Sequence, residues 1–297
     1  MTNITNPHDR FFKESFSRLE VIQSFIEEVF PTEIGNKINL NSIKLTNSSF
    51  TDSILSEYLA DLTYQCEYEG EEAVITLLFE HKSYQSDFPQ WQLLRYMTNV
   101  WHENQKQKKK STVVIPIIIY HGNTAWMKMS MRTYFGNPTS DLLRFIPEFD
   151  YLLFSLNEFE DYQIASFNNN FLSTTAMLLK HSRDEKEKFL SLISFWVEKL
   201  NALDKAHEVD FIRSMFIYID NATNLTYNDL IIIFAKVSNN VTNIAMTIAE
   251  EIQTNTTINH IKGLLKKGVD ANFIADAFEL PIKYVEDIIQ KIKASSN

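Results

Sequence analysis

The chain has 297 residues and carries 28 Lys and Arg against 38 Asp and Glu, a formal net charge of −10 at pH 7. An acidic balance of this size argues against a protein that coats nucleic acid through a general basic surface. Basic residues do cluster locally in the run Lys106 to Lys110, which contains Lys106, Lys108, Lys109 and Lys110. This run is typical either of the solvated end of a helix or of a local contact with phosphate.

The single cysteine, Cys66, excludes an intrachain disulfide and a cysteine-rich zinc site, and it points to the reducing cytoplasm. Residues 1–10 contain no apolar leader, and the apolar run over 113–120 is too short to span a bilayer, so no membrane partner is expected. The six glycines form no phosphate-binding loop, which argues against a nucleotide cofactor.

The first half of the chain predicts an alternation of helices and strands. Apolar residues at three- and four-residue steps predict a helix over 10–30 that ends before Pro31, and a second helix with a proline in its first turn. Continuous apolar runs bounded by turn residues predict strands buried on both faces. The expected order is a helix over 10–30, strands over 38–46, 62–68 and 73–79, a helix over 89–107 and a strand over 113–120.

Beyond residue 156 the apolar pattern becomes purely helical. Helices are expected over 171–179, 186–203, 209–218, 230–237 and 242–252, and then over three short segments between 258 and 292. We therefore expect two domains, residues 1–160 and 161–297. The last three helices are compatible with a helix-turn-helix-like segment over 258–295. Its mixed surface charge favours packing or dimerisation over the reading of DNA.

Acidic residues on the predicted hairpin are the first candidates for chemistry. If the hairpin is symmetric about Gly70 and Glu71, opposed residues have numbers that sum to 141, and Asp61 then faces Glu80 at about 5 Å. Two facing carboxylates are tolerated where a cation bridges them or where one pKa is shifted. Side chains alternate along a strand, so Lys82 is expected on the same face as Glu80.

This constellation suits one hard divalent cation. Asp61, Glu80 and the backbone carbonyl of His81 supply the oxygen ligands that Mg²⁺ prefers, with positions left for phosphate and water. Lys82 would orient or deprotonate that water and stabilise the developing charge. The alternative is structural: Asp61 would start a strand, and residues 80–82 would be a charged strand end that reaches solvent.

Several short motifs in the first 125 residues together resemble the Rpn recombination-promoting nucleases, also described as YhgA-like putative transposases, of the PD-(D/E)xK superfamily. The resemblance covers roughly residues 7 to 125. Its carriers are His8-Asp9-Arg10-Phe11-Phe12-Lys13, Asp61-Leu62-Thr63-Tyr64, Leu77-Leu78-Phe79-Glu80-His81-Lys82-Ser83, Gln92-Leu93-Leu94-Arg95-Tyr96-Met97, and Ile115-Pro116-Ile117 with Tyr120-His121-Gly122.

The resemblance implies a restriction-endonuclease-like α/β (α+β) core with a mixed central sheet between two helices, followed by an all-α C-terminal domain. It implies that Asp61, Glu80 and Lys82 match the nuclease triad. Gln92 and Tyr96 look like the QxxxY motif of RecB-like nucleases, where the four-residue spacing lets an amide and a phenol hold DNA or a water on one helical face.

Members of the superfamily often add an acidic residue from the first helix, for which Glu20 is the candidate and Glu14 the alternative. His8 and Asp9 match the opening motif of the family, but Asp9 is equally suited to cap the first helix. His121 follows a strand beside Gly122, where a histidine hydrogen-bonded in a turn is the expected role.

Together these patterns predict a Mg²⁺-dependent DNA endonuclease, with Mn²⁺ as a substitute. We expect it to have little sequence preference, to be linked to recombination or mobile elements, and to form a homodimer that cuts both strands. The competing hypothesis is a catalytically silent DNA-binding or regulatory protein on the same fold, which the acidic charge favours. A purely helical scaffold is the third alternative, against which the strand-rich first half argues.

Overall fold

The computed structural model describes residues 6–46, 62–69, 71–82, 84–85, 88–136 and 138–294. Within β3 it describes side chains only from Lys82, and the side chains of residues 227, 252, 253, 255, 291, 293 and 294 also lie outside it. The described part combines one five-stranded sheet with many helices, which confirms the predicted mixture of an α/β part and a helical part.

The sheet is mixed, with its strands in sequence order, β1 to β5. β1–β2 and β2–β3 are antiparallel, whereas β3–β4 and β4–β5 are parallel. A short turn can join antiparallel neighbours, whereas parallel ones need a crossover, which α4 supplies between β3 and β4. The strands are β1 Lys44–Leu45, β2 Leu62–Tyr68, β3 Glu71–Lys82, β4 Val113–Tyr120 and β5 Leu152–Ser155.

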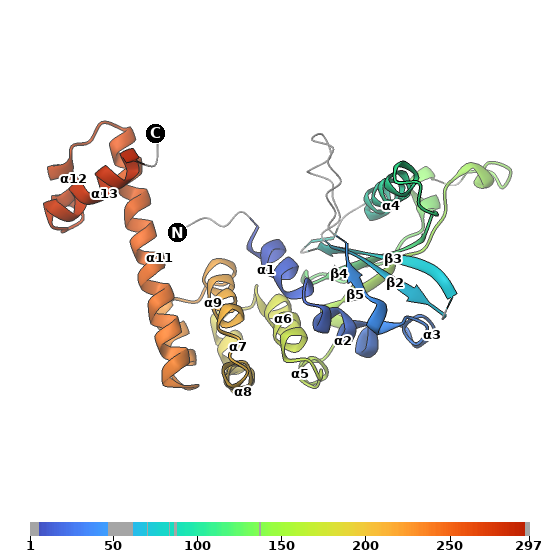
Figure 1. Cartoon of the computed structure of the whole chain (residues 1–297), viewed down its shortest axis with the longest axis horizontal. Helices are drawn as coiled ribbons and strands as arrows, with labels where there is room; N and C mark the ends of the chain where they lie inside the picture. The colour runs from blue at the N-terminus through green and yellow to red at the C-terminus, as the bar shows by residue number, and fades with distance from the viewer. Residues whose placement is uncertain are drawn as a thin grey trace.

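β4 is covered on both faces, as its continuous apolar run predicts. Ile117 and Ile119 belong to the larger core, which contains side chains of α1, α2 and α6. Ile118 and Tyr120 point the other way, into a smaller core beneath α4 (Pro89–Lys106). The sheet therefore lies between α4 on one side and α1, α2 and α6 on the other (Figure 1).

The helix predicted over 10–30 is in fact two helices, α1 (Pro7–Phe16) and α2 (Leu19–Val29). The break lies at Arg18, whose backbone is extended with φ −77° and ψ 125°. Its guanidinium lies 4.2 Å from the ring centroid of Phe171 and 3.3 Å from the Glu208 carboxylate. The apolar periodicity runs through the break, so local pattern does not mark it, and the Arg18 side chain at the break contacts distant parts of the chain.

Other elements also differ from their predicted bounds. The strand expected over 38–46 is a 3-10 turn, Leu40–Ser42, followed by the two-residue β1. The helix expected over 186–203 is divided into two, α7 and α8. The helix expected over 242–252 and the one expected from 258 are a single helix, α11, because the polar residues between them include no proline to stop it.

The remaining helices are α3 Thr32–Gly35, α5 Asp161–Ala165, α6 Asn170–His181, α7 Lys186–Ser191, α8 Ile193–Lys205, α9 Val209–Ala222, α10 Tyr227–Phe234, α11 Asn239–Lys266, α12 Ala271–Ala277 and α13 Ile282–Ala294. α6, α8, α9 and α10 contribute to the same core as α1 and α2. The far end of α11 extends away from the other helices and shares a separate small core with α12 and α13 (Figure 1). The domain boundary near residue 160 and the helix-turn-helix-like segment stay predictions.

Among the residues that the structure describes, no helix is both long and apolar enough to cross a membrane.

Candidate active site

The β2–β3 hairpin has the register that the sequence predicts. Leu62 pairs with Phe79 and Glu67 with Val74, so opposed numbers sum to 141 along this stretch. Only at the turn does a bulge bring Tyr68 opposite Glu71. Asp61 and the side chain of Glu80 lie outside the described residues, so their expected approach stays a prediction.

Lys82 is the last residue of β3 and is bonded to α4 through its side chain. Its Nζ donates a hydrogen bond of 2.7 Å to Oε1 of Gln92. Nε2 of Gln92 in turn donates to the hydroxyl of Tyr96. The structure therefore brings together three of the five side chains predicted for the site, one from the sheet and two from the helix.

The position of α4 explains this meeting. The helix begins at Pro89 and packs Leu93, Met97 and Val100 against Val114 and Ile118 of β4. Gln92 and Tyr96 are four residues apart and so lie on one side of the helix. Tyr96 is buried and Gln92 half-buried, and both lie beside the end of β3.

The hydrogen bonds from Lys82 to Gln92 and from Gln92 to Tyr96 set the orientation of the Gln92 amide. An ammonium group can only donate, so Gln92 must turn its carbonyl oxygen to Lys82 and its NH₂ to Tyr96. Lys82 is only 8% exposed. The Gln92 amide thus holds the Lys82 ammonium at the C-terminal end of β3. An ammonium has three N–H groups, so Lys82 can donate to an anionic oxygen as well as to Gln92.

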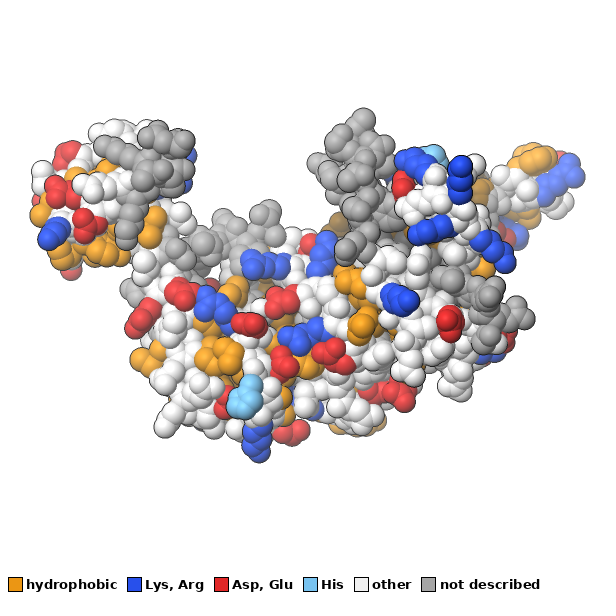
Figure 2. Space-filling model, viewed as in Figure 1, with side chains coloured by type: hydrophobic (Ala, Val, Ile, Leu, Met, Phe, Trp, Pro, Cys, Tyr) orange, Lys and Arg blue, Asp and Glu red, His pale blue; other side chains and the backbone are white. Residues whose placement is uncertain are grey.

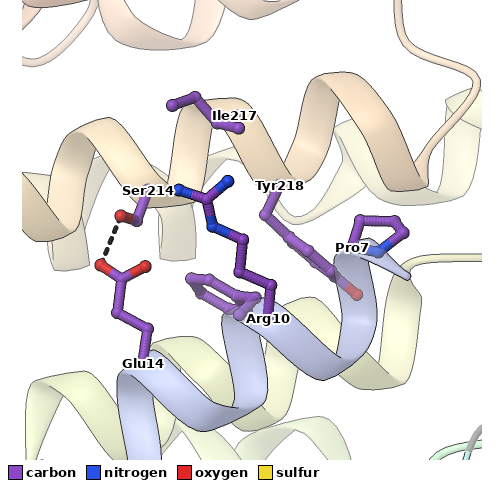
Figure 3. A pocket seen from close by; sticks show the side chains of 7 residues that line it. Pro7, Arg10, Glu14, Ser214, Ile217 and Tyr218 are labelled. Carbon is purple, nitrogen blue, oxygen red and sulfur yellow. Dashed lines mark hydrogen bonds between the residues drawn. The ribbon is translucent and has the colours of Figure 1, made fainter. Parts of the chain in front are cut away.

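Each of the two candidate acidic residues of the first helices has its own described contacts elsewhere. Glu20, on α2, is exposed and lies 3.6 Å from the Arg18 guanidinium. Glu14, on α1, accepts a hydrogen bond from Ser214 of α9 in a small pocket between the two helices (Figure 3). Neither described set of contacts includes Lys82, Gln92 or Tyr96. Their role as a further metal ligand stays a prediction.

Among the described side chains, no group of three or more His, Cys, Asp and Glu could hold a metal ion. Two of the predicted ligands, Asp61 and the Glu80 carboxylate, are not among the described side chains. The third is the backbone carbonyl of His81, a residue that pairs with Ile119 in the parallel ladder, while Glu80 pairs with Ile118.

Beside this edge lies a contact that sequence reasoning did not predict. The backbone N–H of His121 donates to the Lys82 carbonyl at 3.0 Å. The rings of His121 and His8 have their centroids 4.8 Å apart, and Nδ1 of His8 lies 2.9 Å from the hydroxyl of Tyr218. Nδ1 of the His121 ring also lies 3.0 Å from the carbonyl oxygen of Leu179.

Both histidines are neutral at pH 7. Burial, and secondarily the charge of Arg183, lowers the pKa of His8 to about 4. Burial lowers the pKa of His121 to about 3, with smaller contributions from His8 and Arg183. Because a carbonyl can only accept, His121 carries its proton on Nδ1. His121 is therefore a hydrogen-bonded residue that joins β4 to α6, which agrees with the role predicted for it.

The suggestion that Asp9 caps the first helix is wrong. The side chain of Asn6 accepts the N–H of Asp9 and so caps the helix, whereas the Asp9 carboxylate lies 3.0 Å from Nζ of Lys13. Asp9 therefore stabilises the first turn by its charge and by an ion pair rather than as the cap.

Comparison with known families identifies the chain. A family model described as "Putative transposase, YhgA-like" matches residues 6–210. This match contains the hairpin, α4, the two histidines and most of the helices that pack beneath the sheet. The chain belongs to the YhgA-like putative transposase family.

Curated relatives of this family member are named as recombination-promoting nucleases. It is 27% identical over 128 residues to the recombination-promoting nuclease RpnC of Escherichia coli (strain K12), covering 43% of each chain. It is 27% identical over 146 residues to RpnD of Escherichia coli O157:H7, covering 47% of this chain and 56% of that protein.

Another relative carries the name "Inactive recombination-promoting nuclease-like protein RpnE", from Escherichia coli (strain K12). This chain is 25% identical to it over 181 residues, which is 61% of this chain and 60% of the relative. The chain thus spans about half the length of the curated relatives it matches. No solved structure matches it.

Proposed function

We propose that this protein is a Mg²⁺-dependent DNA endonuclease of the PD-(D/E)xK type. The observation that carries the proposal is the hydrogen bond from Lys82 at the end of β3 to Gln92 on α4, continued to Tyr96. Three residues that a nuclease site requires by resemblance thus meet, although they come from separate elements. The names of the relatives RpnC and RpnD support the same reading.

The donor set of the proposed metal site consists of oxygen atoms. Asp61, Glu80 and the His81 carbonyl would hold the ion, and hard oxygen ligands suit Mg²⁺ and Mn²⁺ better than softer metals. The hairpin register supports this set, because the Leu62–Phe79 pair is followed in numbering by residues 61 and 80. When bound, such an ion polarises the phosphoryl group and lowers the pKa of water.

The residues of the chain itself would position the reacting groups. Lys82 would donate to the attacking water or to a phosphate oxygen and would stabilise the negative charge that develops during hydrolysis. Gln92 would hold the Lys82 ammonium in one direction, and Tyr96 would hold the Gln92 amide. Partial burial strengthens each of these interactions, because the local dielectric is low.

The wider role follows the family. We infer DNA as the substrate, cleavage with little sequence preference, and a part in recombination or the mobility of genetic elements. One site per chain would cut one strand at a time, so a homodimer would cut both. We infer a location in the cytoplasm, because the single cysteine is free and buried and the inferred substrate is DNA.

The test is cleavage of supercoiled plasmid by the purified full chain with Mg²⁺, Mn²⁺, Ca²⁺ or EDTA. Wild type is compared with Asp61→Ala and with Lys82→Met, each checked for equal thermal stability. We expect nicking that needs Mg²⁺ or Mn²⁺ and falls at least about 100-fold in both variants, as for loss of a group that acts in the transition state. Equal cleavage by wild type and both variants would reject the proposed site.

The name of RpnE favours a second candidate, a DNA-binding protein without nuclease activity on the same fold. It predicts that plasmid stays intact with every metal while DNA binding persists. A mobility-shift measurement on the same samples therefore separates the two candidates.

A further inference from the structure

Four aromatic side chains form a surface beside the candidate active site. Phe88 and Trp91 lie at the start of α4, while Tyr134 and Phe135 come from the segment after β4. The rings of Phe88 and Tyr134 meet at 4.6 Å between centroids, and those of Trp91 and Phe135 at 5.9 Å. We call these four residues the aromatic surface.

The aromatic surface is open to solvent. Phe88, Trp91 and Phe135 are 52%, 47% and 45% exposed. A lone exposed aromatic residue is common, but paired rings from two distant segments leave a contiguous apolar patch, and such patches mark interaction sites. Ring faces that remain open can stack on a flat partner.

Buried hydrogen bonds of Gln90 link the start of α4 to the segment after β4. Gln90 is only 1% exposed. Its Nε2 donates to the Met129 carbonyl, and its Oε1 accepts from the hydroxyl of Tyr134. Gln90 therefore fastens the segment after β4 to the first turn of α4, so the rings are held in place before any partner arrives.

The charge of this region indicates the chemistry of the partner. Residues 84–150 carry eight Lys and Arg against five Asp and Glu, whereas the rest of the chain carries 20 against 33. Basic side chains gather over α4 and the chain beside it on the face shown in Figure 2. Lys106, Lys128 and Arg132 form ion pairs with Glu103, Asp150 and Glu148, and the exposed Lys108, Lys109 and Lys110 follow the C-terminal end of α4. Such a local excess of positive charge in an acidic protein fits a polyanion.

The aromatic surface also adjoins the candidate active site in the sequence. Trp91 immediately precedes Gln92, whose Oε1 accepts from Lys82. A DNA strand that lies on the rings would therefore contact the same turn of α4 that carries Gln92.

We propose that the aromatic surface binds unpaired nucleotides of a DNA strand next to the cleavage site. Bases stack on the rings, and the exposed lysines at 108–110 contact phosphates further along the strand. Stacking needs a free base face, which single strands and duplex ends with overhangs present and intact duplex hides. The inference rests on the proposed function for its substrate and adds the form of DNA that is preferred.

The test is a fluorescence-anisotropy titration of the full chain in EDTA, so that cleavage does not interfere. The probes are a labelled 20-nucleotide single strand, a blunt duplex of the same sequence, and that duplex with a single-stranded overhang. Trp91→Ala is compared with Trp91→Phe, which keeps a stacking ring. The matched control is Phe273→Ala, because Phe273 is 61% exposed on α12.

We expect wild type to bind the single strand and the overhang more tightly than the blunt duplex. Trp91→Ala should weaken binding of the first two on the order of 10-fold, since one stacked base is lost. Binding of the blunt duplex should stay unchanged, and Trp91→Phe and Phe273→Ala should resemble wild type.

Equal affinity of Trp91→Ala and wild type for the single strand would overturn the proposal, as would equal weakening on single strand and blunt duplex. If Trp91→Ala instead converts a dimer to a monomer in sedimentation without a change in DNA affinity, the surface binds a second copy and the proposal is wrong. Binding is measured without cleavage, so an inactive protein can still satisfy this inference, and an active one can fail it.

Discussion

The imidazole ring of His8 lies against that of His121, with ring centroids 4.8 Å apart and an angle of 48° between the planes. The two residues are 113 positions apart, one at the start of α1 and the other just after β4. Since the N–H of His121 donates to the carbonyl of Lys82, the pair connects the first helix to the candidate active site through the backbone. Protonation of either ring would place a charge in this interior.

The first prediction concerns acid. Both rings have folded pKa values below the ordinary 6.5, about 4 for His8 and about 3 for His121. Below pH 6.5 the unfolded chain binds protons that the folded chain excludes, so the stabilising contribution is complete above 6.5 and decreases as the pH falls toward 4 and 3. His121 alone should lower the free energy of unfolding by about 1 kcal/mol per pH unit in that window. Urea titrations between pH 7 and 4 measure it.

The control for this prediction is His121→Asn, whose amide N–H can still donate to the Leu179 carbonyl but does not titrate. Carboxylates titrate in wild type and variant alike, so only the difference in slope reports the imidazole. The expected result is a flatter dependence on pH in the variant. Parallel curves for the two proteins would show that the ring of His121 does not exclude its proton.

The second prediction concerns the two side-chain hydrogen bonds that connect Lys82 to Gln92 and Gln92 to Tyr96. Tyr96→Phe removes the acceptor of the Gln92 amide and should lower kcat of DNA cleavage several-fold. Gln92→Ala removes the contact with Lys82 itself and should lower it about 10-fold or more. Steady-state cleavage rates test both. Because the residues act through one another, the double variant should lose less than the product of the two effects; independent effects would argue against a connected chain.

The third prediction concerns the break between α1 and α2. Arg18→Ala should reduce the free energy of unfolding by about 1–2 kcal/mol, through loss of the cation–π contact with Phe171 and the ion pair with Glu208. Arg18→Lys should recover only part of this, since an ammonium lacks the planar stacking group. Urea unfolding of both variants and of Glu208→Gln measures the effects. A fully stable Arg18→Ala variant would mean that the break needs neither contact.

The fourth prediction concerns Cys66 on β2. The thiol is 2% exposed, and burial raises its pKa to about 12. Thiolate is therefore scarce at pH 8, and a disulfide reagent should modify the native protein far more slowly than the unfolded chain. Following the colour reaction with and without 6 M guanidinium tests this. Rapid reaction of the native protein would show that β2 opens readily.

Local pattern was sufficient for the elements nearest the candidate site. The predicted bounds of the strand over 62–68 and the strand over 113–120 agree with β2 and β4, and the helix over 89–107 agrees with α4 within one residue. Proline at position 89 and the change from apolar residues to His121 and Gly122 mark these ends, and such signals act within a few residues. The hairpin register followed from the same kind of local information.

Two features that the sequence pattern did not predict involve contacts between residues far apart in the chain. At the break, the Arg18 side chain contacts Phe171 and Glu208, and the ring of His8 on α1 contacts that of His121 just after β4. Neither has a local signal in the sequence, because the partners lie far away along the chain.

The sequence by itself determined β2, β4 and α4, because periodicity and turn signals are local properties. Only the tertiary structure decided that Lys82 donates to Gln92, that Glu14 bonds to Ser214, and that rings from two segments form one exposed surface. The physical reason is that side-chain direction and burial depend on which elements pack together, and that packing is settled by the whole chain.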